Sequence, residues 1–190
     1  MVLANGSTIE CDGVIAGVGA APETALATKA GLEIDNGVRV DATLCTSDPN
    51  IFAAGDCCSF IHPLYGGRRI RLEAWRNAQD QGTLAARNML GALAPHDSVP
   101  WFWTDQYELT LQITGIPDEG AATVTRHVDD SAEVHFHLAA DGRLIAASGL
   151  GRTGAIARDI RLAEMLIAKG ARPAANELAN PNIRLKSLLV

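Results

Sequence analysis

Two apolar runs and one helical repeat organise the first half of the sequence. Residues 14–19 (VIAGVG) and 51–54 (IFAA) are short and almost wholly apolar, which is typical of strands covered on both faces of a parallel sheet. From about residue 74 to residue 90, apolar positions recur near the helical spacing, and Gly91 and Pro95 end the pattern. The first half therefore predicts the end of an α/β unit that closes with a long amphipathic helix.

Beyond residue 100 the apolar positions alternate with polar ones. This alternation predicts strands at residues 109–113, 122–125, 134–138 and 144–148. Asp141-Gly142 is a turn signal between the last two, and we expect the strands to form an antiparallel meander. A final helix at about 153–169 carries apolar residues on one face and stops at Gly170. The second half is therefore α+β, and residues 92–100 read as the connection between the halves.

Local turn signals add detail to the first half. Asn5-Gly6 and Asn36-Gly37 each lie between apolar residues, and this dipeptide favours a tight hairpin. A short helix is predicted from residue 22, ending at Gly31.

Composition and charge narrow the functional classes. The chain has 190 residues, of which 47% are hydrophobic, and a net charge of -6. The apolar content excludes wholesale disorder, and the acidic balance argues against nucleic-acid binding, which needs a basic face. The sequence has neither an apolar run of the ~20 residues needed to cross a bilayer nor a signal peptide at its start. We therefore expect no membrane partner and a cytoplasmic setting.

The segment from Gly17 to Pro22 (GVGAAP) resembles a dinucleotide-binding fingerprint but departs from it. Its third position is Pro22 rather than Gly or Ala, and no ribose-binding acid follows at the usual distance. The alternative is a tight strand-to-helix turn. Two glycines at the end of a strand would still let the backbone approach a ligand closely.

The stretch from Thr46 to Asp56 (TSDPNIFAAGD) is more specific. Its small and apolar residues would deliver Gly55 and Asp56 to the carboxyl edge of a sheet, where open α/β folds bind ligands. A carboxylate there suits a sugar or ribityl hydroxyl as a charge-assisted acceptor. The alternative is that Asp56 only caps a loop.

The start of the long helix is a second candidate site. Free N–H groups at a helix start favour an electron-rich partner such as a carbonyl-bearing ring. Trp75 could pack beside a planar cofactor, although a buried core tryptophan is the commoner role.

Other residues with reactive side chains are weaker candidates. Cys57 and Cys58 are adjacent, unlike the Cys-x-x-Cys of redox sites, and we interpret them as small buried hydrophobes. His135 and His137 share a strand face but lack further ligands at metal spacing. No metal site and no catalytic acid, base or nucleophile is assigned.

These segments together resemble the FAD-dependent pyridine-nucleotide reductases. More narrowly, the chain is similar to the ferredoxin reductases of bacterial oxygenase systems, the group of the putidaredoxin and rubredoxin reductases. The resemblance covers nearly the whole chain in order. It is carried by residues 12–19, 46–56, 73–82, 100–107 and 178–181 (DGVIAGVG, TSDPNIFAAGD, EAWRNAQDQG, PWFWTDQY, LANP).

The resemblance implies roles for six residues. Asp56, preceded by Gly55, matches the aspartate that hydrogen-bonds the ribityl chain of FAD. Trp75, preceded by Glu73 and Ala74, falls where the family contacts the flavin, at the helix start that approaches the ring's pyrimidine edge. Trp103 lies at the start of the family's C-terminal domain, on the flavin side of the molecule.

The resemblance also implies a division of the chain. Residues 1–20 match the end of an NAD-binding domain, residues 21–96 the C-terminal segment of an FAD-binding domain, and residues 97–190 an α+β C-terminal domain. The family's two glycine fingerprints are absent, so we expect a fragment: the closing part of a two-dinucleotide-binding fold followed by an α+β domain with an antiparallel sheet. Residues 1–91 should then be poorly stable alone or rebuilt by dimerisation, whereas residues 97–190 could fold by themselves.

Two functions of different classes follow from this. The parent protein would pass electrons from NAD(P)H through FAD to a [2Fe–2S] ferredoxin that serves an oxygenase. Alternatively, this chain is a non-catalytic binding or assembly module that holds no flavin. The disulfide-reductase branch is disfavoured because no cysteine pair has redox spacing. Arg68, Arg69, Arg71 and Arg76 form a basic cluster that could steer an acidic ferredoxin, or else a solvated surface.

Overall fold

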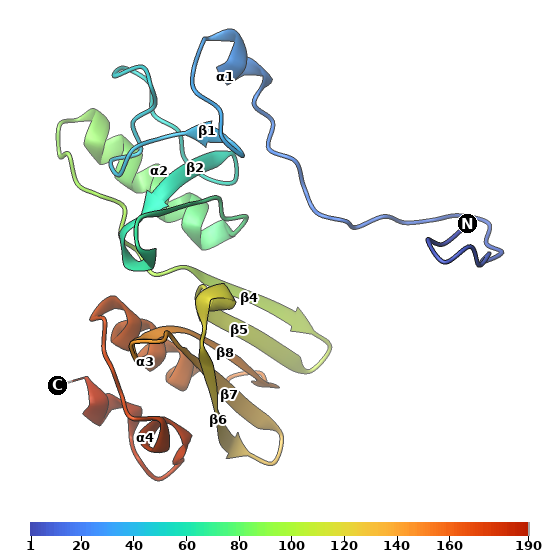
Figure 1. Cartoon of the computed structure of the whole chain (residues 1–190), viewed down its shortest axis with the longest axis vertical. Coiled ribbons are helices and arrows are strands. Elements are labelled where there is room, and N and C mark those ends of the chain that lie inside the picture. The colour runs from blue at the N-terminus through green and yellow to red at the C-terminus, as the bar shows by residue number, and fades with distance from the viewer. Residues whose placement is uncertain (190) are drawn as a thin grey trace.

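A computed structural model of the chain describes residues 1–189. Two units and an amino-terminal arm make up the molecule: the arm (residues 1–24), the first unit (residues 25–90) and the second unit (residues 101–189). Figure 1 shows the two units one above the other, with the arm extending to the side of the first.

The first unit is a small sheet with one long helix packed on it. Its elements are α1 (Ala25–Lys29), β1 (Val38–Arg39), β2 (Cys58–His62), the 3-10 turn η1 (Pro63–Tyr65), β3 (Arg68–Ile70) and α2 (Trp75–Met89). β1 pairs in parallel with β2, and β2 pairs antiparallel with β3. A small core joins the sheet to α2 and is formed by Val40, Leu44, Cys58, Phe60 and Ala85.

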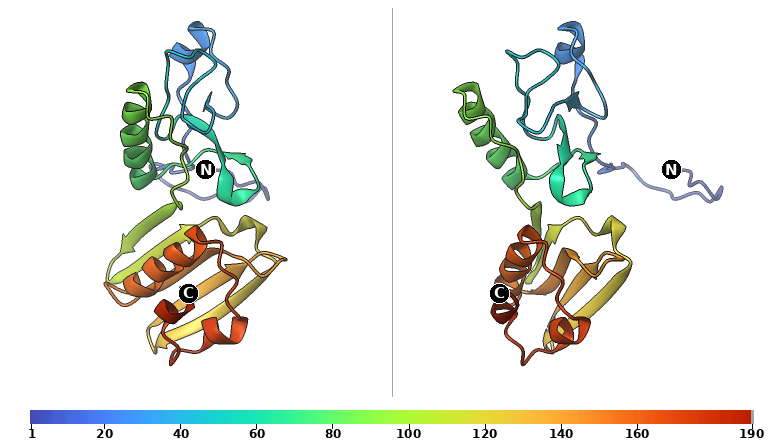
Figure 2. Two further views of the ribbon diagram at one scale, coloured as in Figure 1. Left: turned by 90° about the vertical axis from the view of Figure 1, so that its left-hand side faces the viewer. Right: turned by 60° about the vertical axis from the view of Figure 1, so that its left-hand side comes forward.

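The second unit is a five-stranded antiparallel sheet covered by helices. Its strands are β4 (Trp101–Gln106), β5 (Leu109–Gly115), β6 (Ala122–Asp129), β7 (Ala132–Leu138) and β8 (Leu144–Arg152). Its helical elements are η2 (Pro117–Glu119), α3 (Ala157–Ala168), α4 (Ala175–Ala179) and η3 (Leu185–Leu188). Figure 2 shows α3 lying across one face of this sheet, where Phe136, Ile160 and Leu166 belong to the main core.

The expected meander is only partly right. The strand order is β4-β5-β8-β7-β6, so β8 lies between β5 and β7. β6, β7 and β8 do form a meander, but β5 pairs with the last strand in the sequence rather than with the next one. Alternation of side chains gives the faces of a strand and not its neighbours, which is why the sequence pattern could not distinguish these orders.

Two expected strands in the first half are wrong. Residues 14–19 form no strand, and Val14, Ile15 and Val18 are 61%, 101% and 92% exposed. Residues 51–54 make only one isolated bridge, between Cys45 and Phe52. An apolar run becomes a buried strand only when other strands and a covering layer lie beside it. Within residues 1–189 the first segment has neither. The second packs against the small core of the first unit, but it pairs with residues 44–46 at a single bridge, which is too little for a strand.

Most of the other local predictions are confirmed. The helix expected at 74–90 is α2, and the final helix is α3, with Gly170 in a left-handed conformation just beyond it. At Asn36-Gly37 both residues have positive φ, as a tight hairpin turn requires. Only an isolated bridge, Ile34 to Val38, closes that hairpin.

Two buried side chains hold the parts together. The hydroxyl of Tyr65 in η1 donates to the carbonyl oxygen of Ile145 at 3.2 Å and accepts from the N–H of Ile116 at 3.1 Å, which ties the first unit to the second. The guanidinium of Arg126 donates to carbonyl oxygens of Leu178, Asn180, Pro181 and Ile183 and pairs with Asp159 at 3.2 Å. Arg126 therefore anchors the last segment of the chain to β6.

Candidate functional site

The loop at Gly55 and Asp56 lies against α2. The N–H of Gly55 donates to Oε1 of Gln81 at 2.8 Å, and its φ of +82° is one that glycine adopts readily. A Cβ at this position would lie 3.4 Å from the Cβ of Ala78, so glycine also allows the close approach. Asp56 follows at the surface, and its carboxylate takes part in none of the hydrogen bonds or ion pairs found within residues 1–189. This carboxylate is free to accept a hydrogen bond from a ligand.

The amino end of α2 is open to a ligand as well. Ala74 is the N-cap residue and offers no side-chain cap, and the first turn holds no acidic residue. The N–H groups of that turn are therefore electropositive and uncapped. Glu73, just before the cap, is exposed and pairs instead with Arg71, at 2.7 Å between Oε1 and Nη1.

Tryptophans from the two units meet at this end of the helix. Trp75 of α2 is 67% exposed, so a role as a core tryptophan is wrong. Its ring centroid lies 6.4 Å from that of Trp103 on β4, at an interplanar angle of 86°. Trp103 in turn stacks on Trp101 at 5.1 Å, and the Arg76 guanidinium lies 5.6 Å from the centroid of the Trp101 ring. The exposed Trp75 ring leaves room for another planar group.

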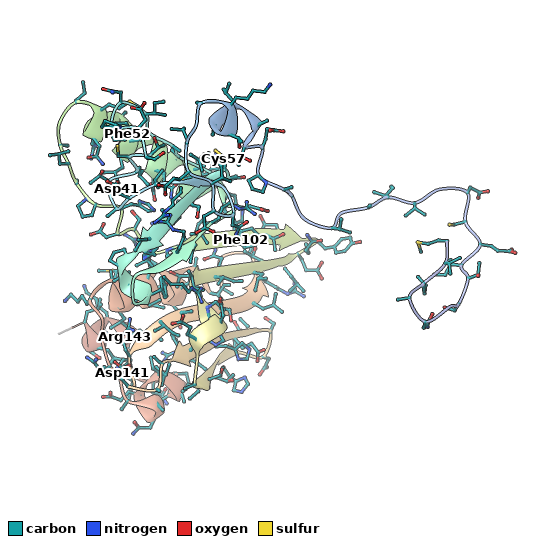
Figure 3. All side chains as sticks on the ribbon, turned by 45° about the horizontal axis from the view of Figure 1, so that its top comes forward. Asp41, Phe52, Cys57, Phe102, Asp141 and Arg143 are labelled. Atoms are coloured by element: carbon teal, nitrogen blue, oxygen red, sulfur yellow. The ribbon has the colours of Figure 1, made fainter. Side chains whose placement is uncertain are left out.

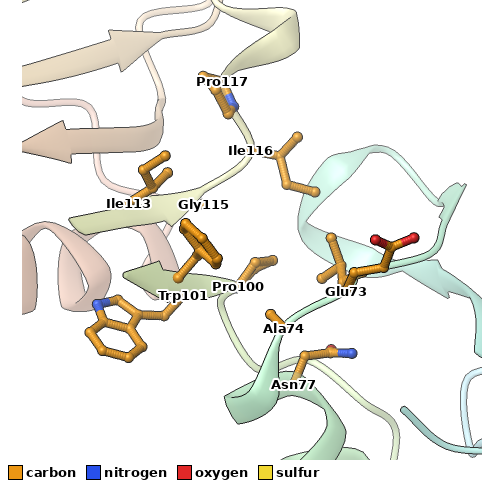
Figure 4. Close-up of a pocket in the computed structure, with 11 residues that line it drawn as sticks. Glu73, Ala74, Asn77, Pro100, Trp101, Ile113, Gly115, Ile116 and Pro117 are labelled. Carbon is orange, nitrogen blue, oxygen red and sulfur yellow. The ribbon is translucent and has the colours of Figure 1, made fainter. Parts of the chain in front are cut away.

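A pocket of about 260 Å³ opens at the junction of the two units (Figure 4). Its lining is mostly apolar and comes from the start of α2, from β4 and from the end of β5: Leu72, Glu73, Ala74, Asn77, Pro100, Trp101, Phe102, Ile113, Gly115, Ile116 and Pro117. Nδ2 of Asn77 is buried without a hydrogen-bond partner within residues 1–189, and so is Nε2 of Gln81 one turn further along α2. A buried donor without an acceptor costs free energy, so both amides could serve a ligand or a bound water.

Sequence reasoning did not single out these two amides. The one indication in the sequence is their spacing, because residues four apart on a helix share a face. That spacing alone does not say whether the face meets a pocket, the solvent or the core.

Of the other sequence candidates, the glycines of the arm and the two histidines lie apart from this site, whereas Cys57 and Cys58 directly follow Asp56. Gly17 and Gly19 belong to the exposed arm, which leaves the body of the molecule (Figure 3). The four cysteines are free thiols. Cys58 is fully buried as expected, and burial raises its pKa to about 12, whereas Cys57 is only partly buried. His135 and His137 hydrogen-bond to Thr125 and Thr123 across the sheet.

The arginine cluster is largely neutralised by neighbouring carboxylates. Arg68 pairs with Asp118 and Glu119, at 2.9 and 3.1 Å. Arg76 pairs with Glu164 of α3 at 2.6 Å, and Glu164 also holds Arg161. These pairs remove most of the free positive charge that a steering patch needs.

Within residues 1–189, no three histidine, cysteine or acidic side chains are grouped so that they could hold a metal ion. Over the same residues no helix combines the length and apolar character needed to span a membrane.

Comparison with known proteins identifies relatives over almost the whole chain. Residues 1–82 match the family model described as pyridine nucleotide-disulphide oxidoreductase, and residues 101–189 match the one described as reductase C-terminal. The ferredoxin–NAD(+) reductase component of the anthranilate 1,2-dioxygenase system of Burkholderia cepacia is 42% identical over 95% of this chain and 44% of its own length.

Solved structures agree with this result. A ferredoxin reductase from Rhodopseudomonas palustris has a TM-score of 0.90 and 34% identity, over 100% of this chain and 46% of its own. The reductase in a covalent putidaredoxin reductase–putidaredoxin complex has a TM-score of 0.87 and 30% identity, over 98% of this chain and 43% of its own. The chain thus spans less than half the length of the relatives it matches. Both family models and these relatives show that the chain is similar, over nearly all of its length, to part of the ferredoxin reductases that match the pyridine nucleotide-disulphide oxidoreductase model.

Proposed function

We propose that this chain supplies the part of an NAD(P)H-dependent ferredoxin reductase that holds the ribityl chain and ring of FAD. The proposal rests on three features found together in the first unit and at its junction with the second. They are a free carboxylate, an uncapped helix start and an exposed tryptophan pair. Asp56, the amino end of α2, and Trp75 with Trp103 supply these three features. Each suits a different portion of a flavin.

The residues present fit this cofactor chemically. A ribityl hydroxyl would donate to the Asp56 carboxylate, which makes no other bond within residues 1–189. The free N–H groups at Ala74 and Trp75 would donate to a ring carbonyl, and pairing with Arg71 keeps the Glu73 carboxylate from capping them. The Trp75 and Trp103 rings would contact the planar ring system. The unpartnered Nδ2 of Asn77 adds one more buried donor nearby.

When bound, FAD would supply the chemistry that accepts hydride from NAD(P)H and releases electrons singly. The residues of this chain bind and orient the flavin, and the tryptophans limit the access of water on their side. No side chain of this chain is assigned a proton transfer.

The wider assignments also remain proposals. A small [2Fe–2S] ferredoxin serving an oxygenase is the proposed electron acceptor, the setting is the cytoplasm, and a homodimer is one assembly open to test. Residues 1–20 would close an NAD-binding domain, residues 21–96 an FAD-binding domain, and residues 97–190 would form the C-terminal domain.

A second candidate function is a binding or assembly module without flavin. The exposure of Val14, Ile15 and Val18 in the arm supports it, because such apolar surface favours association. The two functions differ in whether the purified chain takes up FAD.

Titration of the purified chain with FAD, followed by flavin fluorescence and visible absorbance, tests the proposal. We expect saturable binding that Asp56→Asn weakens by about ten- to a hundredfold, the loss of one charge-assisted hydrogen bond. Asp12→Asn, an exposed carboxylate in the arm, is the matched control and should leave the affinity unchanged. A chain that binds no FAD would contradict the flavin function and favour the binding module.

A further inference from the structure

Arg71 joins three segments of the first unit that are distant in sequence. Its Nη1 donates to the carbonyl oxygen of Asp56 at 3.0 Å and to Oε1 of Glu73 at 2.7 Å. Its Nε donates to Oδ1 of Asn36 at 3.4 Å. The Arg71 side chain is only 12% exposed, whereas its partners Asn36, Asp56 and Glu73 lie at the surface. A planar guanidinium with fixed donor directions holds such partners at fixed separations better than a flexible ammonium does.

The hairpin turn at Gly37 is shaped to admit this side chain. A Cβ on Gly37 would lie 3.0 Å from Cδ of Arg71 and 2.6 Å from the carbonyl oxygen of Cys57. The N–H of Val38 donates to that same oxygen at 2.7 Å. The turn, the Arg71 stem and the Gly55–Asp56 loop are therefore packed as one unit, which is a second observation independent of the Arg71 hydrogen bonds.

These contacts constrain both parts of the candidate flavin site, the Asp56 carboxylate and the amino end of α2. The Asp56 carboxylate makes no bond of its own within residues 1–189, so its position depends on its backbone, which Arg71 holds at the carbonyl oxygen. Glu73 immediately precedes the N-cap residue of α2, and its carboxylate could otherwise turn toward the free N–H groups there. Pairing with Arg71 holds that carboxylate away from the helix start.

We propose that Arg71 is a positioning residue that sets the spacing between Asp56 and the amino end of α2, and thereby fits the site to a ligand with a ribityl chain attached to a flat ring. The inference rests on the proposed function. Arg71 need not touch the ligand, because it acts through the Asp56 peptide and the Glu73 carboxylate.

The test compares Arg71→Ala and Arg71→Lys with the unaltered chain, all in a Cys11→Ser, Cys45→Ser background. FAD affinity is one measurement. The other, made without FAD, is the rate at which a thiol reagent modifies Cys57 and Cys58, which lie directly after Asp56. Arg39→Ala is the matched control, because Arg39 pairs with Glu33 at 2.8 Å where both side chains are more than half exposed.

We expect Arg71→Ala to weaken FAD binding by about ten- to a hundredfold, since two charge-assisted bonds that order the site are lost. Loosening of the loop should raise the thiol modification rate by about tenfold, because Cys58, which is fully buried at the start of β2 directly after the loop, reacts only when this part of the structure opens. Arg71→Lys should restore part of both properties, and Arg39→Ala should change neither. If Arg71→Ala fails to fold by circular dichroism, the lysine variant decides on the same criteria.

The outcomes separate this inference from the proposed function. A chain that binds no FAD in any form contradicts the proposed function, and the thiol rates then decide the spacing role alone: faster modification supports it and unchanged rates overturn it. Where the unaltered chain binds FAD, variants with unchanged affinity overturn the inference. Weaker FAD binding with unchanged thiol rates also overturns it, because Arg71 would then act by direct contact.

Discussion

At the scale of single residues, the burial of His96 couples its ionisation to folding. His96 lies in the segment that connects the two units, packed against β2, with 3% of its surface exposed. Its ring centroid is 5.0 Å from that of Phe60 and 6.2 Å from that of His62. Burial lowers its pKa to about 4, and the neighbouring His62 adds to the shift. The folded chain therefore holds a neutral imidazole where the unfolded chain would take up a proton.

We predict that the free energy of unfolding falls as the pH is lowered from 6.5 toward about 4. The unfolded state binds more protons in this window, so stability rises with pH, by on the order of 3 kcal/mol for His96. Urea unfolding at a series of pH values measures the slope. His96→Gln should flatten it, while the exposed His127→Gln should not. An equal slope in the His96 variant would contradict the prediction, since His62 would then carry the whole effect.

The residues of the candidate site differ in how far the sequence could predict them. The Gly-Asp motif and the helix start were recognisable because each has a local signature. The exposure of Trp75, the amides of Asn77 and Gln81, and the bonds of Arg71 depend on segments that meet only after folding. Local sequence does not specify those meetings.

At the scale of elements, the pairing of β5 with β8 depends on a close backbone approach at Gly115. Its φ is +77°, and a Cβ there would overlap the carbonyl oxygen of Ile145. Gly142, in the turn between β7 and β8, has a similar φ of +79° but no atom within 4 Å of such a Cβ. The two glycines therefore separate the cost of backbone conformation from that of steric contact.

We predict that Gly142→Ala lowers the free energy of unfolding by about 1 kcal/mol, the usual cost of a positive φ for alanine. Gly115→Ala should cost about 3 kcal/mol or more, because β5 and β8 must also move apart. Urea or thermal unfolding followed by circular dichroism measures both values. Equal costs for the two variants would be evidence against the close approach at Gly115.

The same scale explains which elements were predictable. α2 and α3 repeat their apolar positions over several turns, and such a helix satisfies its own backbone hydrogen bonds. The apolar runs at 14–19 and 51–54 need neighbouring strands to become a sheet. Within residues 1–189 the first run has none beside it, and the second meets its neighbour only at the bridge between Cys45 and Phe52. The position of β8 between β5 and β7 likewise depends on which strands pair with it, and the pattern of a single strand does not specify that.

At the scale of the whole molecule, buried core residues and backbone hydrogen bonds are unevenly distributed along the chain. Within residues 1–189 the main core, formed by the second unit together with Val99 of the connecting segment, contains fourteen buried residues, and that of the first unit contains five. No backbone hydrogen bond found over the same residues involves positions 10–22 of the arm. Resistance to unfolding should follow this distribution.

We predict that limited digestion with a non-specific protease first cuts within residues 10–22. Residues 21–96 should then be degraded faster than residues 97–190, because the smaller core opens at a lower cost in free energy. Mass spectrometry of timed samples identifies the products. Earlier loss of the segment 97–190 would contradict the expectation that it folds by itself.

The sequence by itself determined the two long helices, the strands β5 to β8 of the second half but not β4, and the family that the Gly-Asp and Pro-Trp-Phe-Trp segments resemble. These features rest on periodicity and on contiguous motifs, which a chain carries before it folds. Only the tertiary structure decided the strand order, the exposure of the arm, the meeting of Trp75 with Trp103, and the three bonds of Arg71. Apart from the exposure of the arm and the bond between Arg71 and Glu73, each joins residues distant in sequence, whose packing and hydrogen bonds form only when the chain closes on itself.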